Sequence, residues 1–492
     1  MDLGNKANWG GTSIFVLKIT LFLALAAHLT SSIHMPQFFE HLARGHWIIS
    51  NHSLPDAYIW SKLSFANSPW SDPNWLFEIL ISVCETNFGE VGLIVLKISA
   101  VFLSIYSLSL LLSCLSRDEF FGCLLAIVIT SGVYVSNDLL PSCLALSLAC
   151  FFFYLVAKEN INALILLVLV YLCCNIDATF AILLPISLFF TNNRKSFFIL
   201  LAVLLIAFLS PPYWGMQIVD GLRSELDSLS WDILLQRKAA NVFDFRFAFL
   251  LLTWMLIGVV SKRQLLIERG VKLLLFVSAI FSIFGLASTD FLALGLVSSS
   301  VLLAKLWSSY EDLEAQNLAL GLKRLQDKLT KISPIGIIWV FLAICIISIK
   351  PLLAYPVSYA LLPKQEVDLA LSRGLKLPIY HDSFVGSYLA YRFSMSGLSP
   401  AETVLATSQA EAFSAHATGL DRRSPRIEYL AQTLNPHFFE YFDFLAPKSV
   451  ICRRSEPLFS VLVRDPKWKE VSAPEEGLYQ GLFGWVLFER SE

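Results

Sequence analysis

Eleven apolar runs dominate the sequence and constrain its fold more than any other feature. In chain order they lie at about 13–32, 91–115, 119–136, 139–157, 160–175, 178–191, 196–212, 245–261, 270–287, 289–308 and 335–354. A hydrocarbon core of about 30 Å needs roughly 20 apolar residues in a helix, so the shorter runs must extend into their turns. The pattern predicts an α-helical polytopic membrane protein with about eleven transmembrane helices.

The composition agrees with this prediction. Apolar residues make up 56% of the 492 positions, and charged residues only 15%. A soluble chain of this size could not bury so much apolar surface, whereas lipid accepts it. The balance of 37 basic and 39 acidic residues argues against nucleic acid as a partner, because no basic stripe neutralises a phosphate backbone. The nine cysteines lack the spacing of a disulfide framework or of a metal site.

Basic residues in the connections set the predicted orientation. If the eleven helices alternate, the following all fall on one side: Lys6, Arg117, Lys158, Arg194, Lys195, Lys262, Arg263, Arg269, Lys323, Arg324, Lys328 and Lys331. The short turns on the other side carry no Lys or Arg. The positive-inside rule therefore places the N-terminus in the cytoplasm and the C-terminal part of the chain outside it.

The same rule decides the nature of Trp75–Asn87, which is apolar enough to suggest a further span. Counting it as a span would invert every later helix and place the basic turns outside. The segment also contains Glu78 and Glu85. We interpret it as an amphipathic helix at the outer interface. The first outer loop, 33–90, would then hold two interfacial helices, with Pro36–Leu42 contributing to the first.

The composition changes near Tyr355. From 365 onward, short β-like runs alternate with helical patterns. The expected strands are Leu377–Tyr380, Ser449–Cys452 and Phe483–Glu489. A helix is expected to start within Gly386–Tyr391. We therefore predict two domains: a transmembrane domain at 1–354, which includes the first outer loop, and a soluble extracytoplasmic α/β domain at 355–492.

Acidic residues near the predicted outer ends of the helices are the candidate site. Asp56 lies in the first outer loop, and Asp138 and Asp177 lie at helix ends. Converging carboxylates can bind a divalent metal or deprotonate an acceptor hydroxyl, although a single aspartate at such a place more often caps a helix. Lys97 lies about 9 Å inside its helix at 1.5 Å per residue. It either binds a lipid phosphate or extends its ammonium to the interface.

Four regions of the chain carry a resemblance. They are LPDAYIWS and SPWSDPNWLFEILISVCETNFGEVGLIVLK within 54–97, LCCNIDATFAILLP at 172–185, SPPYWG at 210–215, and PIYHDSFVGSYLAYRF (378–393) with DPKWKEVSAPEEGLYQGLFGWVLFER (465–490) in the C-terminal domain. Together with the predicted outer loop and outer domain, they resemble uncharacterised bacterial membrane proteins that are grouped with the GT-C superfamily of glycosyltransferases. The resemblance implies sugar transfer from a polyprenyl-phosphate donor at the outer face of the bacterial cytoplasmic (inner) membrane.

The resemblance also implies roles for individual residues. Asp56 is the implied catalytic acid or base, or a ligand of a divalent metal. The implied substrate-binding residues are Tyr58, Lys97, Asp138 and Asp177. The expected partners are membrane lipid, the polyprenyl-phosphate sugar, and membrane or periplasmic proteins.

Three positions depart from the pattern of these proteins. Tyr58 occupies the place of their loop aspartate, Asp177 that of a histidine, and Leu140 that of an arginine. Each change alters the charge or the hydrogen-bonding capacity of the implied site. The sequence thus leaves open a second hypothesis, a non-catalytic GT-C-fold subunit or scaffold that binds partner proteins through its outer domain. A transporter is less favoured, because the sequence contains no inverted repeat.

Overall fold

The structure is a computed structural model of the 492-residue chain. The residues it describes are 11–33, 36–55, 60, 74–134, 141–159, 162–177, 184–190, 194–209, 245–260, 269–287, 289–308, 320–324, 334–357, 362–374, 376–381, 383–398, 439, 442–443, 446–471 and 484–491.

The chain divides into two compact units. Unit 1 comprises Met1–Ser32 and Phe88–Pro356, and unit 2 comprises Ile33–Asn87 and Val357–Glu492. The predicted domain boundary after residue 354 lies close to the start of the second part of unit 2. Residues 33–87, which we assigned to the first domain from the sequence, group instead with the C-terminal part of the chain.

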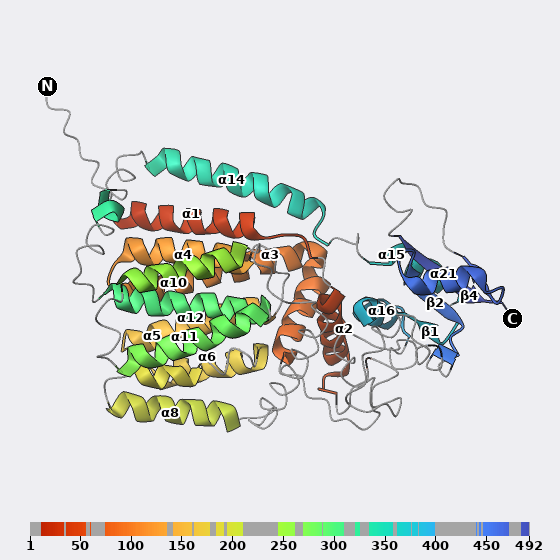
Figure 1. Ribbon diagram of the computed structural model, residues 1–492, viewed down its shortest axis with the longest axis horizontal. Helices are drawn as coiled ribbons and strands as arrows, with labels where there is room; N and C mark the ends of the chain where they lie inside the picture. The colour runs from red at the N-terminus through yellow and green to blue at the C-terminus, as the bar shows by residue number, and fades with distance from the viewer. Residues whose placement is uncertain are drawn as a thin grey trace. The chain divides into compact units, whose positions relative to one another are not determined.

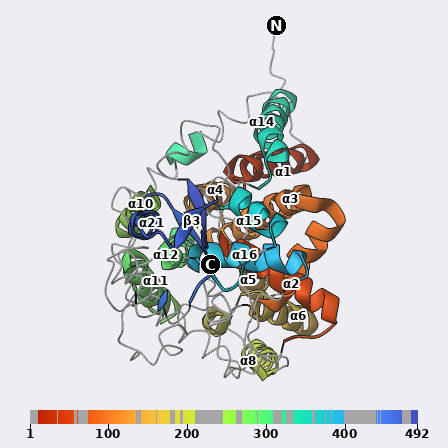
Figure 2. The same cartoon turned by 90° about the vertical axis from the view of Figure 1, so that its right-hand side faces the viewer.

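Unit 1 is an array of helices whose axes run side by side (Figure 1), and Figure 2 looks along these axes. Its elements are α1 (Gly11–Leu29), the second part of α3 (Trp75–Ser116), α4 (Glu119–Tyr134), α5 (Pro141–Ala157), α6 (Ala163–Ile176), the 3₁₀ helix η1 (Leu184–Phe190), α8 (Arg194–Leu209), α10 (Phe245–Val260), α11 (Arg269–Ala287), α12 (Thr289–Trp307) and α14 (Pro334–Ala354). Ten of the eleven apolar runs overlap one of these α-helices. Within the run at 178–191, the described residues form only the short 3₁₀ helix η1.

Small residues and flat aromatic contacts bring the helices of unit 1 together. A Cβ added at Gly122 of α4 would lie 2.4 Å from the backbone nitrogen of Ser113 in α3. The rings of Phe121 and Trp307 stack at 4.0 Å between α4 and α12. Such close approach through small residues is typical of helices that pack without a hydrophobic driving force between them.

Two of the described helices have the length and apolar composition needed to cross a bilayer, namely Trp75–Ser116 and Ile337–Ala354. The other apolar helical segments among the described residues are 10–17 residues long. The core helix of a soluble protein can pass the same test. The structure therefore establishes a mostly helical fold with a small sheet, and the topology of eleven spans stays a prediction.

Gly89 breaks α3 into two parts. Its φ of 63° and ψ of −160° are not helical, and a positive φ of this kind favours glycine because it has no Cβ. The boundary between the units, after Asn87, falls next to this break. The predicted separation of Trp75–Asn87 from the span at 91–115 coincides with it.

Unit 2 combines helices with a small mixed sheet. Its described elements are α2 (Pro36–Asn51), the first part of α3, α15 (Lys364–Ser372), β1 (Ile379–Tyr380), α16 (Ser383–Met395), β2 (Ser449–Arg453), α21 (Pro457–Arg464), β3 (Trp468–Glu470) and β4 (Trp485–Arg490). The strand order is β1-β2-β4-β3, with β1 parallel to β2 and the other two pairs antiparallel. The three predicted strands and the helix at α16 are confirmed, and the short edge strand β3 was not predicted.

Apolar side chains join α21 to the sheet. Leu458 and Leu462 of α21 pack into a cluster with Val450 of β2 and with Val486 and Phe488 of β4. All five side chains are buried. Because alternate residues of a strand point to one face, this cluster identifies the face of the sheet that α21 covers.

The helices α2 and α3 approach each other at backbone distance in unit 2. A Cβ added at Gly45 would lie 2.0 Å from the carbonyl oxygen of Glu78 and 2.2 Å from Oγ of Ser82. The Ser82 hydroxyl donates a hydrogen bond of 3.1 Å to the carbonyl oxygen of Leu42. Only glycine at position 45 permits this contact.

We predict that Gly45→Ala destabilises the protein. In an open helix, alanine is more favourable than glycine by about 1 kcal/mol, but here the added methyl must separate two helices, and overpacking costs about 1–3 kcal/mol. Thermal unfolding of the full-length variant should show a lowered midpoint. The control is Gly258→Ala in α10, where a Cβ would meet nothing within 4 Å. An unchanged or raised midpoint for Gly45→Ala would contradict the described packing.

Candidate functional site

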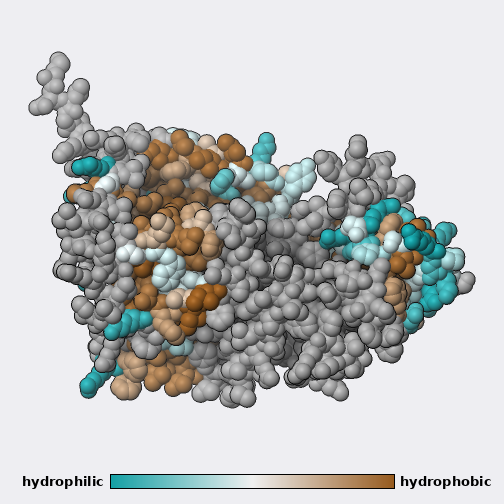
Figure 3. Space-filling model, in the orientation of Figure 1, coloured by the Kyte–Doolittle hydropathy of each residue, from teal (hydrophilic) through white to brown (hydrophobic). Residues whose placement is uncertain are grey.

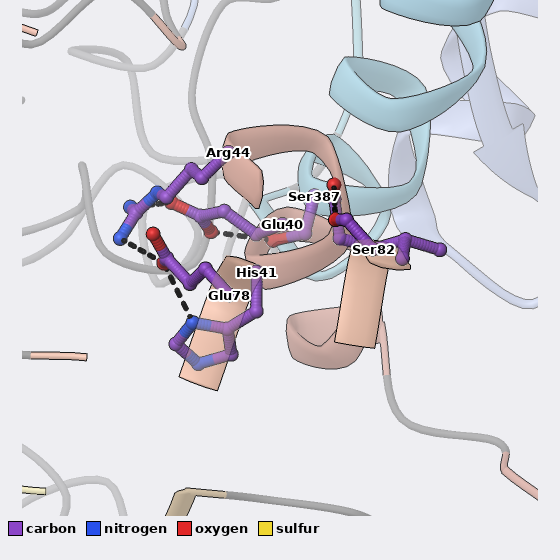
Figure 4. Close-up of polar contacts among 7 residues, drawn as sticks. Glu40, His41, Arg44, Glu78, Ser82 and Ser387 are labelled. Atoms are coloured by element: carbon purple, nitrogen blue, oxygen red, sulfur yellow. Dashed lines mark hydrogen bonds and ion pairs between the residues drawn. The ribbon is translucent and has the colours of Figure 1, made fainter. Parts of the chain in front are cut away.

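A seam of polar and ionisable side chains runs along the contact of α2, the first part of α3 and α16. We call it the polar seam. Its members are Glu40, His41, Arg44 and His46 of α2, Glu78, Ser82 and Glu85 of α3, and Ser387 and Tyr391 of α16. Figure 4 shows the buried half of the seam. All of these residues belong to unit 2.

Glu40 is the centre of the first set of contacts. Its Oε1 atom accepts a hydrogen bond from the Arg44 guanidinium, one turn further along α2. Its Oε2 atom accepts a 2.8 Å bond from the hydroxyl of Ser387 in α16. Glu40 and Arg44 are both buried. A spacing of four residues places them on one face of α2, and this face is turned inward.

Glu78 brings a second carboxylate to the same guanidinium. Its Oε1 atom lies 3.6 Å from Nη1 of Arg44 and 3.0 Å from Nδ1 of His41. Arg44 thus contacts two buried carboxylates. The net charge of the two carboxylates and the guanidinium is one negative charge. A protonated His41 would bring this net charge to zero. Burial penalises any uncompensated charge, so the four groups depend on one another.

His46 and Glu85 form a second, less buried layer of the seam. Nε2 of His46 lies 2.9 Å from Oε2 of Glu85, and each side chain is 19% exposed. The Tyr391 hydroxyl donates to the other carboxylate oxygen of Glu85 at 3.3 Å. The hydrogen bond from His46 holds the pKa of Glu85 below its usual value, against the opposing effect of desolvation. The Glu85 carboxylate is therefore ionised at neutral pH.

The two layers differ in what they can do chemically. The buried layer places one guanidinium against two carboxylates and joins α2, α3 and α16. The layer at His46 and Glu85 is accessible, and a carboxylate bonded to an imidazole can accept and return a proton. Among the residues that the structure describes, no group of three or more His, Cys, Asp or Glu is arranged to bind a metal ion.

Three of the predicted site residues, Asp56, Tyr58 and Asp138, lie outside the described residues. Lys97 lies in the part of α3 that belongs to unit 1 and is buried. Its ammonium donates to the carbonyl oxygen of Ser31 at 2.9 Å and to its hydroxyl at 3.2 Å. Ser31 follows the C-terminus of α1, where the helix dipole favours a cation.

Asp177 is half-buried at the C-terminus of α6, also in unit 1. Its backbone N–H donates to the carbonyl oxygen of Cys173 at 3.0 Å. This is a helix-end position, as the sequence predicted. Lys97 therefore contacts Ser31, and the backbone of Asp177 contacts Cys173. The roles in substrate binding that we expect for these two residues stay predictions.

The basic half of the polar seam was not predicted from the sequence. Glu78 and Glu85 served there only as evidence against a span, and Arg44 and His46 were not singled out. An acidic and a basic residue four apart, as in Glu40 and Arg44, usually mark an exposed helix face. The available signal was the spacing of seven between the two glutamates, which places both on one face of a helix that is otherwise apolar.

Neither a comparison with profiles of known families nor a comparison with curated proteins finds a match to this chain.

We predict that Arg44→Met strongly destabilises unit 2, because it leaves Glu40 and Glu78 buried without their shared guanidinium. Breaking a buried ion pair in this way costs about 3–5 kcal/mol. Denaturant unfolding of the full-length protein measures it. The control is Arg392→Met, since the Arg392–Asp368 pair is partly exposed and such pairs contribute at most about 1 kcal/mol. Equal losses in the two variants would refute the dependence on Arg44.

The lowered pKa of Glu85 predicts a pH dependence of stability. A carboxyl group with a lowered pKa in the folded state stabilises the protein above its unfolded pKa of about 4.3. This contribution is lost as the pH falls through the folded pKa. The difference in unfolding midpoint between the native protein and Glu85→Gln should therefore shrink as the pH is lowered from about 6 to about 3. A difference that does not change with pH would contradict an ionised Glu85.

Proposed function

We propose that the chain is a polytopic membrane glycosyltransferase of the GT-C type. It transfers a sugar from a polyprenyl-phosphate donor to an acceptor hydroxyl at the outer face of a bacterial cytoplasmic membrane. The observation that carries the proposal is the combination within one chain of an apolar helical array with a polar unit that holds an accessible carboxylate–imidazole pair.

The exposed surface of unit 1 supports a membrane location. Only 11% of the apolar window of α14 is buried, and Trp339, Ile346 and Ile347 are each about two-thirds or more exposed. Large apolar side chains are also exposed on α6, α8, α10 and α11, namely Leu164, Phe198, Met255, Phe276 and Ile283. On the face seen in Figure 3, brown apolar surface covers much of the described part of the helical array. Apolar surface on this scale is unfavourable in water and is accommodated by lipid.

The first part of α3 supports the interfacial location predicted for it. Its buried side carries Glu78 and Ser82 of the seam beside the apolar Phe77 and Ile81, whereas Leu80 and Val83 are exposed. Exposed apolar side chains on a short helix of this kind are suited to the boundary between headgroups and acyl chains. The absence of basic residues from the predicted outer turns agrees with an outer location of unit 2.

The transfer reaction fits the residues that the resemblance implies. The acceptor hydroxyl loses its proton to a base, its oxygen bonds to the anomeric carbon, and the bond from that carbon to the phosphate breaks. The polyprenyl phosphate leaves with the bonding electron pair, and a cation stabilises it. In this proposal Asp56 serves as the acid or base or binds a divalent metal, and the donor is bound by Tyr58, Lys97, Asp138 and Asp177.

We predict that Asp56→Asn lowers sugar transfer by at least about 100-fold, the smallest usual contribution of a general acid or base. Membranes containing the variant are supplied with labelled polyprenyl-phosphate sugars, and product formation is measured against the native protein. The control is Asp443→Asn, the same substitution at an exposed position of unit 2. Full transfer by a folded Asp56→Asn variant would refute the role of Asp56.

A non-catalytic scaffold is the second candidate. The departures at Tyr58, Leu140 and Asp177 favour it, because they alter the implied donor site. The buried layer of the polar seam would then serve only to hold unit 2 in shape for partner binding. Unchanged cellular function of Asp56→Asn, together with co-purification of a stable protein partner, would distinguish this candidate from the enzyme.

A further inference from the structure

We infer that one end of the helical array in unit 1 binds the anionic headgroups of a phospholipid leaflet. We call it the basic end, after five exposed side chains: Arg117, Lys158, Arg194, Lys195 and Lys272. The inference rests on the membrane location that is part of the function proposed above. It names the lipid at this end of unit 1 and uses residues of that unit alone.

The order of the helices gathers the five residues at one end of the array. The helix axes run side by side (Figure 1), so the connections along the chain alternate between the two ends. The connections before α4, α6, α8 and α11 therefore lie at the same end. Arg117 precedes α4, Lys158 precedes α6, Arg194 and Lys195 begin α8, and Lys272 lies in the first turn of α11.

The described acidic residues in these connections leave the basic charge largely uncompensated. Asp118 caps α4, since its carboxylate accepts a 3.0 Å bond from the backbone N–H of Phe121. Glu119 pairs with Lys18 of α1 at 3.2 Å, and Glu159 is exposed beside Lys158.

The basic residues that begin α8 and α11 keep their charge uncompensated. Among the residues that the structure describes, Arg194 and Lys272 form no ion pair. An anion from outside the chain is therefore the partner that these two side chains lack.

The residue one turn further along each helix identifies that partner as a lipid. Arg194 is followed at a spacing of four by Phe198, which is 65% exposed, and Lys272 by Phe276, which is 63% exposed. A spacing of four places each pair on one face of its helix. The surface thus changes from cationic to aromatic within about 6 Å along the axis. Headgroup phosphates and acyl chains are stacked in the same order.

An acidic protein surface fits these faces less well than a leaflet. It would satisfy Arg194 and Lys272, but it would have to present apolar side chains one turn away on two separate helices. A phospholipid leaflet presents both kinds of surface all round the array. Positive side chains next to an anionic leaflet also add to its binding one by one.

The opposite end of the array has a different character. Among the side chains described there, Lys350 of α14 is the one exposed Lys or Arg. Lys97 is buried and donates to the carbonyl oxygen of Ser31. The two ends therefore differ in their expected preference for anionic lipid.

Cross-linking from the headgroup tests the inference at individual helices. The full-length protein is reconstituted into nanodiscs that contain phosphatidylcholine and phosphatidylglycerol in equal parts. Photoreactive headgroup analogues of both lipids are added, and mass spectrometry measures the ratio of their cross-links to each peptide. The start of α8 and the start of α11 should prefer phosphatidylglycerol. Equal cross-linking by the two lipids at both places would overturn the inference.

The variant that isolates one charge is Arg194→Gln. It should lower the preference at the start of α8 by about 5-fold, the contribution of one basic side chain near an anionic surface, and leave the preference at Lys272 unchanged. The control is Lys350→Gln, which should change neither preference. An unaltered ratio at α8 in Arg194→Gln would contradict a contact between this side chain and the headgroups.

Thermal unfolding gives a readout that does not depend on cross-linking. The midpoint should be higher with phosphatidylglycerol than in phosphatidylcholine alone, and the difference should vanish at about 1 M salt, where the Debye length is about 3 Å. Inorganic phosphate added to phosphatidylcholine nanodiscs should not raise the midpoint. If it raises the midpoint as much as the lipid does, the basic end binds a soluble anion and the inference fails.

The outcomes separate this inference from the proposed function. Sugar transfer by a protein that shows no preference for the anionic lipid overturns the inference alone. A clear preference in a protein that transfers no sugar supports the inference and refutes the transferase. A protein that does not insert into nanodiscs refutes both.

Discussion

The contact of one guanidinium with two buried carboxylates is the constraint on which unit 2 depends. Arg44 lies between Glu40 and Glu78, and all three are removed from water. Isolated burial of any one of them would cost several kcal/mol, on the order of the whole stability of a domain. The charges therefore require α2, α3 and α16 to hold one arrangement. The close approach of α2 and α3 at Gly45 belongs to the same arrangement.

The same constraint explains why two histidine–glutamate pairs on the same helices have different properties. His41 contacts Glu78, the carboxylate that also faces the guanidinium of Arg44, in a layer from which water is excluded. His46 lies five residues further along α2, where the seam is more exposed and the Glu85 carboxylate is bonded to the imidazole of His46 and the hydroxyl of Tyr391. A rigid buried layer next to a more exposed one holds the outer imidazole ring in one orientation.

The sequence predicted the positions of the helices well because an apolar run specifies a helix by length and composition alone. It also separated Trp75–Asn87 from the following span, since charge asymmetry is a property of the whole chain, and Gly89 interrupts the helix there. It did not predict the polar seam, because the partner of Glu40 on α16 is Ser387, 347 residues away. A pair of residues so far apart leaves no local pattern. The edge strand β3 was missed because three residues are too few for a periodicity.

The construction of unit 2 from Ile33–Asn87 and Val357–Glu492 has a consequence for the order of biosynthesis. The first segment is made before almost all of the apolar helices, and the second is made after the last of them. Until α16 emerges, the carboxylate of Glu40 lacks the hydroxyl of Ser387, and the inward face of α2 has no third helix to cover it. Domains generally fold as units during synthesis, but this one must wait for the end of its chain. A nascent protein cut short anywhere in the helical array would therefore expose ionised groups that only the completed chain can bury.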